Sequence, residues 1–299
     1  MANKNKAHLR KAQPYLLLLP ALLFVIVLMG YPLIESIKIS FSNYNLMDPN
    51  NIYFNGLENY KRMFQDPDLP KILLNTLIWV VCVVGIQFIL GFALALLLNT
   101  KFWGKKIYQS LVFLPWAVAC FLIGLIFKWM FNEYSGVIND LLLKTGIIHN
   151  TISWLGDKTV SLIGPIVGMI WYGIPFFGIM ILAALQSIPT DVFESAKMDG
   201  SSAVNTFFKI TVPYVKPTII ITLLLRVIWV FNSADMVYIM TSGGPANSSA
   251  ILPLYVFNQA FYTMDFGYGA AVGILMMVIL AVYALIFLKV TDYESAGDF

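Results

Sequence analysis

The sequence predicts an all-α integral membrane protein with six transmembrane helices and both termini in the cytoplasm. Of its 299 residues, 59% are hydrophobic and only 12% are charged, whereas a soluble domain carries about 25% charged residues. Apolar runs long enough for a helix to cross the membrane, which takes about 20 residues, recur along the chain. Lys and Arg gather near the ends of these runs on alternate connections, which predicts the orientation.

The first predicted span follows a basic tail, residues 1–11. A basic head before an apolar run also suggests a secretory signal. The run is too long for one, however, and no small-x-small cleavage site follows it, so we expect an uncleaved first helix.

Five further runs complete the predicted transmembrane domain, residues 12–290, before a cytoplasmic tail at 291–299. Four of them lack charge over most of their length, and the remaining run, 218–240, is apolar except for Arg226 and Asp235. The six predicted spans are about 12–40, 72–100, 107–131, 159–187, 214–240 and 266–290.

The distribution of basic residues predicts which connections are cytoplasmic. Basic residues precede the first span, follow the second and follow the fourth, whereas the connection 241–265 has no Lys or Arg. Lys61, Arg62 and Lys71 oppose this assignment, but acidic residues accompany them in the same loop. Residues 188–213 are therefore expected inside the cell.

Several classes of chemistry have no sequence support. There is no GxxxxGK[ST] phosphate loop, no HExxH or GxSxG motif and no cluster of carboxylates at membrane depth. We therefore predict no catalytic and no metal-binding residues, and no nucleic-acid surface. Gly269 and Gly273 form a GxxxG pattern in an apolar run, which favours close helix packing over cofactor binding.

The predicted cytoplasmic connection has the pattern of two short helices joined by a glycine. Pro189 breaks the fourth span, and Asp191 followed by Glu194 resembles a capping box. Gly200 would end the first helix, and Ser201 or Ser202 would cap the second. From the residues alone such an element is a helix lying on lipid, a connector packed on its own bundle, or a docking site for a soluble partner.

A resemblance to a known family appears in this connection. ESAKMDGSSAVNTFFKITVP, residues 194–213, resembles the coupling loop of ABC-importer permeases, with Ser195 in place of the usual alanine. Further similarities are GLENYKRMF at 56–64, ALQSIP at 184–189 and TSGGP at 241–245. Together they resemble the carbohydrate-uptake, maltose-permease-like branch, which implies the type I importer permease fold.

The resemblance implies that the loop docks on a cytoplasmic ATPase and transmits its movement. The implied partners are a second, homologous permease subunit, two ATPase subunits, an extracellular or periplasmic sugar-binding protein and the sugar itself, within membrane lipid. The chain itself would bind no cofactor, because ATP and Mg would belong to the ATPase. The implied coupling residues are Val192 and Phe193 as an apolar plug, Glu194 and Asp199 as polar anchors, Ala196, and Gly200 as the turn.

Arg226 is the second candidate site. An ionisable residue at membrane depth costs about 2.5–3.5 kcal/mol and is a functional hypothesis by default. At a helical repeat of about 3.6 residues, Arg226, Trp229 and Ser233 share a stripe, with Asn232 on its flank. The structural alternative is that Arg226 neutralises an acid on another helix or on a partner.

The resemblance favours a translocation cavity for this stripe. It also implies cavity-lining residues in WYGIPFFG, residues 171–178, namely Tyr172, Gly173 and Phe176. Aromatic rings and hydrogen-bond donors suit a mono- or oligosaccharide, and the guanidinium leaves an acidic sugar open.

Two other functions remain as alternatives. An ion-coupled secondary carrier acting without an ATPase would show inverted repeats, which we do not find. An intramembrane enzyme lacks catalytic groups in this sequence. The leading prediction is a transport subunit rather than an enzyme, in the bacterial cell membrane.

Overall fold

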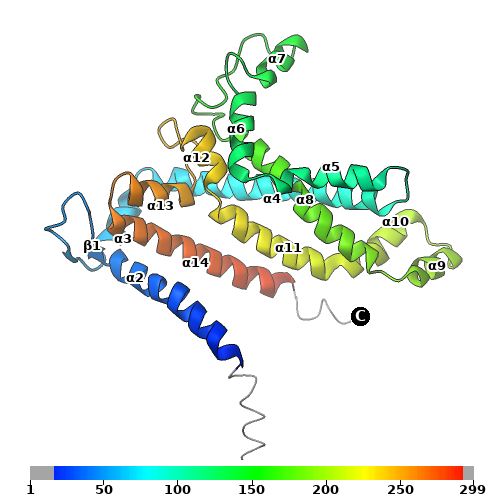
Figure 1. Cartoon of the computed structure of the whole chain (residues 1–299), viewed down its shortest axis with the longest axis horizontal. Coiled ribbons are helices and arrows are strands. Elements are labelled where there is room, and N and C mark those ends of the chain that lie inside the picture. The colour runs from blue at the N-terminus through cyan, green and yellow to red at the C-terminus, as the bar shows by residue number, and fades with distance from the viewer. Residues whose placement is uncertain (1–16, 292–299) are drawn as a thin grey trace, which may run out of the picture. The chain divides into compact units, whose positions relative to one another are not determined.

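The computed structural model describes residues 17–291, which form two compact units. The predicted tails fall outside this part, except for Thr291. Figure 1 shows an almost wholly helical chain. The first helix, Leu17–Ser40, ends with α2 Tyr31–Ser40. The other helices of eight or more residues are α3 Glu58–Gln65, α4 Leu69–Asn99, α5 Lys105–Ala117, α6 Cys120–Met130, α7 Val137–Lys144, α8 Ile163–Gln186, α9 Thr190–Met198, α11 Val212–Asn232, α13 Leu252–Phe261 and α14 Phe266–Thr291.

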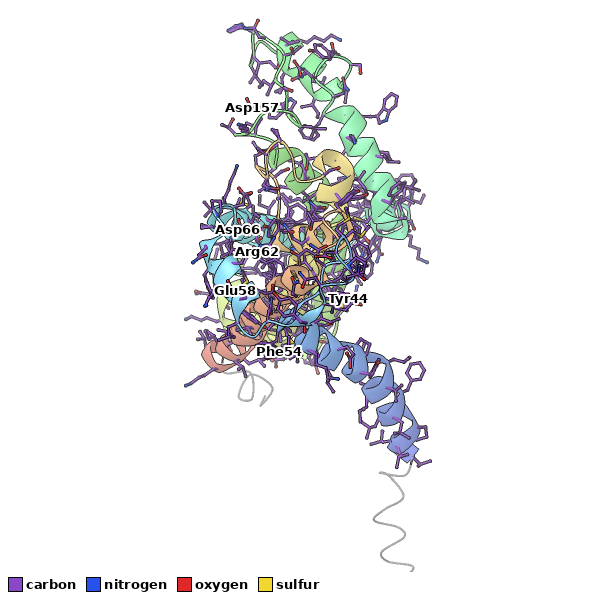
Figure 2. All side chains as sticks on the ribbon, turned by 90° about the vertical axis from the view of Figure 1, so that its left-hand side faces the viewer. Tyr44, Phe54, Glu58, Arg62, Asp66 and Asp157 are labelled. Carbon is purple, nitrogen blue, oxygen red and sulfur yellow. The ribbon has the colours of Figure 1, made fainter. Side chains whose placement is uncertain are left out.

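The first unit comprises residues up to 65 together with 256–275. Its first helix, Leu17–Ser40, includes a π-turn at Ile26–Gly30, and its most apolar stretch has no buried side chain. A two-stranded antiparallel hairpin follows, β1 Ser42–Asn43 and β2 Tyr53–Phe54. The exposed ring of Phe54 marks this hairpin in Figure 2.

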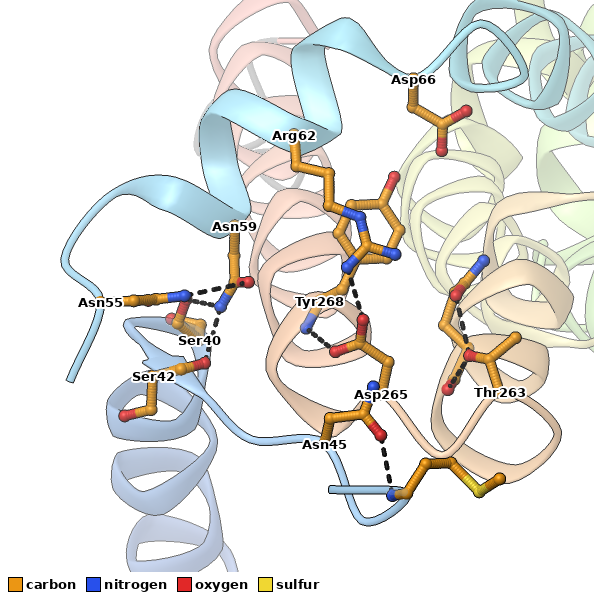
Figure 3. A network of polar contacts seen from close by, with 12 residues as sticks. Ser40, Ser42, Asn45, Asn55, Asn59, Arg62, Asp66, Thr263, Asp265 and Tyr268 are labelled. Atoms are coloured by element: carbon orange, nitrogen blue, oxygen red, sulfur yellow. Dashed lines mark hydrogen bonds and ion pairs between the residues drawn. The ribbon is translucent and has the colours of Figure 1, made fainter. Parts of the chain in front are cut away.

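Side-chain hydrogen bonds tie α3 to the end of α2 in this unit. The amide of Asn59 donates to the backbone oxygens of Ser40 and Ser42, each at 2.9 Å (Figure 3). The next turn of α3 carries Arg62, which reaches Asp265. These polar contacts anchor the loop between α2 and α3, in which most of the apolar side chains are exposed.

The second unit comprises residues 66–255 and 276 onward. Its core lies among α4, α8 and α11, which lie side by side in Figure 1. Gly91 permits the close approach of α4 and α8, because a Cβ there would lie 2.5 Å from the Cβ of Phe177. Trp79 on α4 is fully buried and donates its ring N–H to the backbone oxygen of Val230 on α11 at 2.9 Å.

The third predicted span, 107–131, is not one continuous helix. It consists of α5 and α6, which meet at an angle of 94°. Val118 and Ala119 both adopt extended backbone angles, and Pro115 in the last turn of α5 lacks the N–H that would continue the ladder. The prediction of a straight span was wrong at this point because the break has no glycine or second proline to announce it.

The connection between α6 and α8 is folded rather than extended. Asn139 at its centre donates to the backbone oxygens of Glu133 and Ile152 and accepts from the indole N–H of Trp154, at 2.8–2.9 Å. Asp157 lies in this segment, drawn in green in Figure 2. The Thr159 hydroxyl and backbone N–H that donate to its carboxylate lower the pKa of Asp157.

The fifth predicted span, 214–240, is also interrupted. α11 ends at Asn232, Ser233 adopts an extended conformation, and the short helix α12 runs from Asp235 to Thr241. At its other end α11 begins two residues earlier than predicted. The prediction missed the interruption because it continued one helix through Ser233, which it placed on the same stripe as Arg226.

Within residues 17–291, five helices are long and apolar enough to cross a membrane, and the bent pair α5–α6 makes a sixth. The chain is thus an all-α, multi-pass membrane protein, as the sequence predicted. The motif glycines Gly269 and Gly273 lie in α14 next to Ala260 and Val256, so they serve helix packing in the first unit.

Candidate functional site

The connection after α8 forms a helix, a glycine turn and a second helix, as predicted. Gly200 has a φ of +73°, a conformation that glycine adopts at little cost. Ser202 then caps α10, Ala203–Thr206, by accepting a hydrogen bond from the backbone N–H of Asn205 at 3.3 Å.

Two details of this loop differ from the prediction. The first helix begins at Thr190 after the N-cap Pro189, so Asp191 lies in the first turn and caps nothing through its side chain. The second helix does not hang separately below the membrane, because a π-turn at Phe207–Thr211 joins α10 directly to α11. The wider turn carries the chain past Pro213, which has no backbone N–H to donate. The yellow-green end of α11 in Figure 1 shows this continuity.

The predicted coupling residues divide between two faces of α9. Val192 and Phe193 are half-buried and pack against the core of the second unit, and Ala196 is buried. Glu194 and Asp199 are exposed, and Met198 is 88% exposed. The structure therefore directs the predicted apolar plug inward and presents Met198 as the exposed apolar side chain of this helix.

Arg226 is buried at the centre of the second unit, with only 3% of its surface exposed. Its Nε donates to Oε1 of Gln87 on α4 at 2.8 Å, and Nε2 of Gln87 donates to the backbone oxygen of Met169 on α8 at 2.5 Å. These two bonds link α4, α8 and α11. Gln87 is fully buried, so the chain of bonds lies away from solvent.

No carboxylate of the described residues forms an ion pair with Arg226. Its NH2 nitrogen is buried without a hydrogen-bond partner there. The structural alternative of an acid on another helix of this chain is therefore not what the structure shows. The partner is a neutral amide, which leaves the charge uncompensated.

Gly173 makes the arrangement possible. A Cβ at this position would lie 1.9 Å from NH2 of Arg226 and 2.1 Å from Nε2 of Gln87. No side chain larger than hydrogen fits there without displacing both groups. Gly173, predicted to line a cavity, thus holds open the space that the guanidinium and the amide occupy.

Aromatic rings border this polar cluster. The guanidinium carbon of Arg226 lies 5.4 Å from the ring centre of Phe176, which in turn makes edge contacts with Trp229 and Trp116 at 5.4 and 6.0 Å. Phe176 is buried, whereas Trp229 is 49% exposed. Of the predicted substrate-contacting residues, the structure thus brings Arg226, Gly173, Phe176 and Trp229 together.

The remaining predicted residues are not part of the hydrogen-bonded cluster of Arg226 and Gln87. Asn232 is exposed and donates its amide to the backbone oxygen of Ile228 at 2.8 Å. Ser233 occupies the break between α11 and α12, and Tyr172 is half-buried against the core. Sequence reasoning missed Gln87 and Trp116. Gln87 has a recognisable signal, since it interrupts an apolar run of α4 with a side chain that needs hydrogen-bond partners.

The segment after the TSGGP motif is held against the N-terminal end of α4. The amide of Asn75 donates to the backbone oxygens of Ser248 and Ala250, both at 3.0 Å, and the hydroxyl of Thr76 accepts from the N–H of Leu252 at 2.8 Å. The segment after TSGGP is thus fixed on α4, and these motifs have a structural role.

Comparisons with known proteins identify the class that these features define. The family model "Binding-protein-dependent transport system inner membrane component" matches residues 87–292. This range begins at Gln87 and contains both the Arg226 cluster and the α9–Gly200–α10 loop. The chain belongs to this family of membrane transport components.

Individual relatives cover nearly the whole chain. The sulfoquinovosyl glycerol transport system permease protein SmoG of Agrobacterium fabrum is 34% identical over 92% of this chain and 89% of its own length. The trehalose/maltose transport system permease protein MalF of Thermococcus litoralis is 31% identical over 94% of each chain. Among solved structures, a bacterial ABC transporter for the acidic polysaccharide alginate has a similar fold, with a TM-score of 0.81, 21% identity, and coverage of 97% of this chain and 98% of its own.

Proposed function

We propose that this chain is one permease subunit of an ATP-driven, binding-protein-dependent sugar importer. The observation that carries the proposal is the family match, which spans both candidate sites in one chain. The relatives named for sulfoquinovosyl glycerol and for trehalose and maltose support a sugar as the substrate.

The α9–Gly200–α10 loop is the proposed contact with a cytoplasmic ATPase, which would bind the ATP and Mg. Glu194, Met198 and Asp199 are exposed on α9, and the helix is short and backed by the core through Val192 and Phe193. A helix held on its own bundle transmits a push from outside, whereas a flexible linker would absorb it. A cleft of about 390 Å³ lies beside α9 and makes this surface concave. Its lining includes Phe193, Lys197 and Phe207.

The proposed translocation of the sugar depends on the aromatic and polar groups around Arg226. Trp229 offers a half-exposed ring on which a sugar can stack, and Tyr172, Ser233 and Asn232 supply hydrogen-bonding groups on α8 and α11. A second, homologous permease would complete the pathway, and a sugar-binding protein would deliver the substrate from outside. The exposed apolar first helix, Leu17–Ser40, faces lipid or such a partner.

Purification tests the proposal directly. The tagged chain, expressed with its neighbouring genes, is expected to copurify with an ATPase whose hydrolysis rises when sugar-loaded binding protein is added. Met198→Asp is expected to reduce the amount of ATPase recovered, whereas Met47→Asp, the same change at an exposed position in the loop after α2, serves as a matched control. Sugar uptake that needs an ion gradient and no ATPase would contradict the proposal.

A further inference from the structure

The guanidinium of Arg226 is the one group in the described membrane core of the second unit whose charge and hydrogen bonds are both left incomplete. Its charge has no acidic partner there, and its NH2 nitrogen is buried without an acceptor. A buried charge without compensation is costly, and a structure that keeps one needs an anion or several acceptors to satisfy it.

The arrangement of Gln87 determines which part of the guanidinium remains available. Gln87 uses its oxygen to accept from Nε of Arg226 and its nitrogen to donate to Met169, so both ends of the amide are fixed. The amide cannot turn to offer a second acceptor to NH2. Because Gly173 leaves no atom between the two groups, the guanidinium is held in one orientation with NH2 unpaired.

We propose that Gln87 is a positioning residue that presents the Arg226 guanidinium to an anionic group on the transported sugar, such as a carboxylate or a sulfonate. This inference rests on the proposed function. A planar guanidinium fork binds oxyanions with charge-assisted hydrogen bonds, which are stronger than those made to neutral hydroxyls. A glutamine at position 87 orients the fork without neutralising it, as a glutamate would.

Access to the guanidinium requires movement of Phe176. In this conformation the ring lies against Arg226 and touches Trp229, whose exposed half would hold the sugar ring. A shift of Phe176 would open a path from Trp229 to NH2 without disturbing the two bonds of Gln87. Phe176 then separates a closed state, seen in this structure, from a state that binds the anion.

The test measures binding of matched sugars to the purified complex without its binding protein. The probes are pairs of glycosides and disaccharides that differ only at C6, with a hydroxymethyl group, a carboxylate or a sulfonate. We expect the anionic member of at least one pair to bind at least about tenfold more tightly than the neutral member. We expect this preference to disappear in Arg226→Gln.

Gln87→Glu is the decisive variant because its carboxylate can still accept from Nε of Arg226 while supplying the missing negative charge. The assembled complex should lose its preference for the anionic member of each pair. Gln87→Leu should also lose the preference, and it tests whether orientation matters when charge is unchanged. Gly85→Ala, at an open position of the same helix, is the matched control and should keep the preference.

Each result decides the inference. Equal binding of neutral and anionic sugars, or a preference that survives Gln87→Glu, would overturn it while leaving the proposed function intact. Equal binding would mean that an acid of a partner subunit already neutralises Arg226. Failure of every probe to bind would count against the inference, and the proposed function would still be judged separately by copurification of the ATPase.

Discussion

Arg62 and Arg226 show two ways in which the same side chain is used in this protein. Arg62, in the first unit, is 57% exposed, pairs with Asp265 at 2.5 Å and lies over the ring of Tyr268 at 4.4 Å (Figure 3). Arg226, in the second unit, is buried and bound only to a neutral amide.

The difference lies in what completes each group. The carboxylate of Asp265 satisfies Arg62 and also accepts from the backbone N–H of Tyr268 at 3.1 Å, so this cluster is closed within the chain. In the cluster around Arg226, one donor nitrogen has no acceptor and the positive charge has no acidic partner among the described residues. A complete cluster serves stability, and an incomplete one retained at membrane depth points to a ligand.

The largest effect is expected from closing the space around Arg226. In Gly173→Ala the new methyl group would lie 1.9 Å from NH2 of Arg226, and both the guanidinium and Gln87 would have to move. We expect overpacking to cost about 1–3 kcal/mol of stability and substrate-stimulated ATP hydrolysis to fall at least about tenfold. Gly85→Ala, which meets no atom within 4 Å, should leave both unchanged. Normal hydrolysis in Gly173→Ala would show that the orientation of Arg226 is unimportant.

A much smaller effect is expected from removing the ion pair between Arg62 and Asp265. Arg62→Gln removes an ion pair whose basic partner is largely exposed, and such pairs contribute about 0–1 kcal/mol. We expect a slight fall in the thermal stability of the purified complex and no change in sugar preference. Lys61→Gln, which loses only the exposed contact with Glu58 at 3.4 Å, is the control. A loss of transport in Arg62→Gln with stability retained would remove the contrast between the two arginines.

The sequence predicted the class of fold and the helix–glycine–helix form of the α9–α10 connection, because both depend on local patterns. Apolar runs reveal membrane helices, Gly200 reveals a turn, and Arg226 is conspicuous in an apolar helix. The breaks at Val118 and Ser233 were missed because neither residue forbids a helix, and Pro115 alone does not reveal where α5 ends. Gln87 was missed because its role depends on Arg226, 139 residues away in sequence.

The inward placement of Val192 and Phe193 illustrates the same limit. The amphipathic pattern of α9 identified its apolar face correctly, but pattern alone does not say whether that face meets a partner or the chain's own core. Only the packed structure distinguishes the two, and it shows that this face meets the chain's own core while Met198 is exposed.

The smallest functional effect is expected from single cysteines that report on which side of the membrane each segment lies. With Cys82 and Cys120 replaced by alanine, Phe54→Cys in the hairpin of the first unit and Met198→Cys on α9 place single thiols at positions that are 76% and 88% exposed. Because basic residues assign these segments to opposite sides of the membrane, an impermeant thiol reagent added outside intact cells should label Phe54→Cys alone. Met198→Cys should react only after the membrane is opened, and transport by both unlabelled variants should stay near normal. Labelling of Met198→Cys from outside would show that the predicted orientation is wrong and that a cytoplasmic ATPase cannot contact α9.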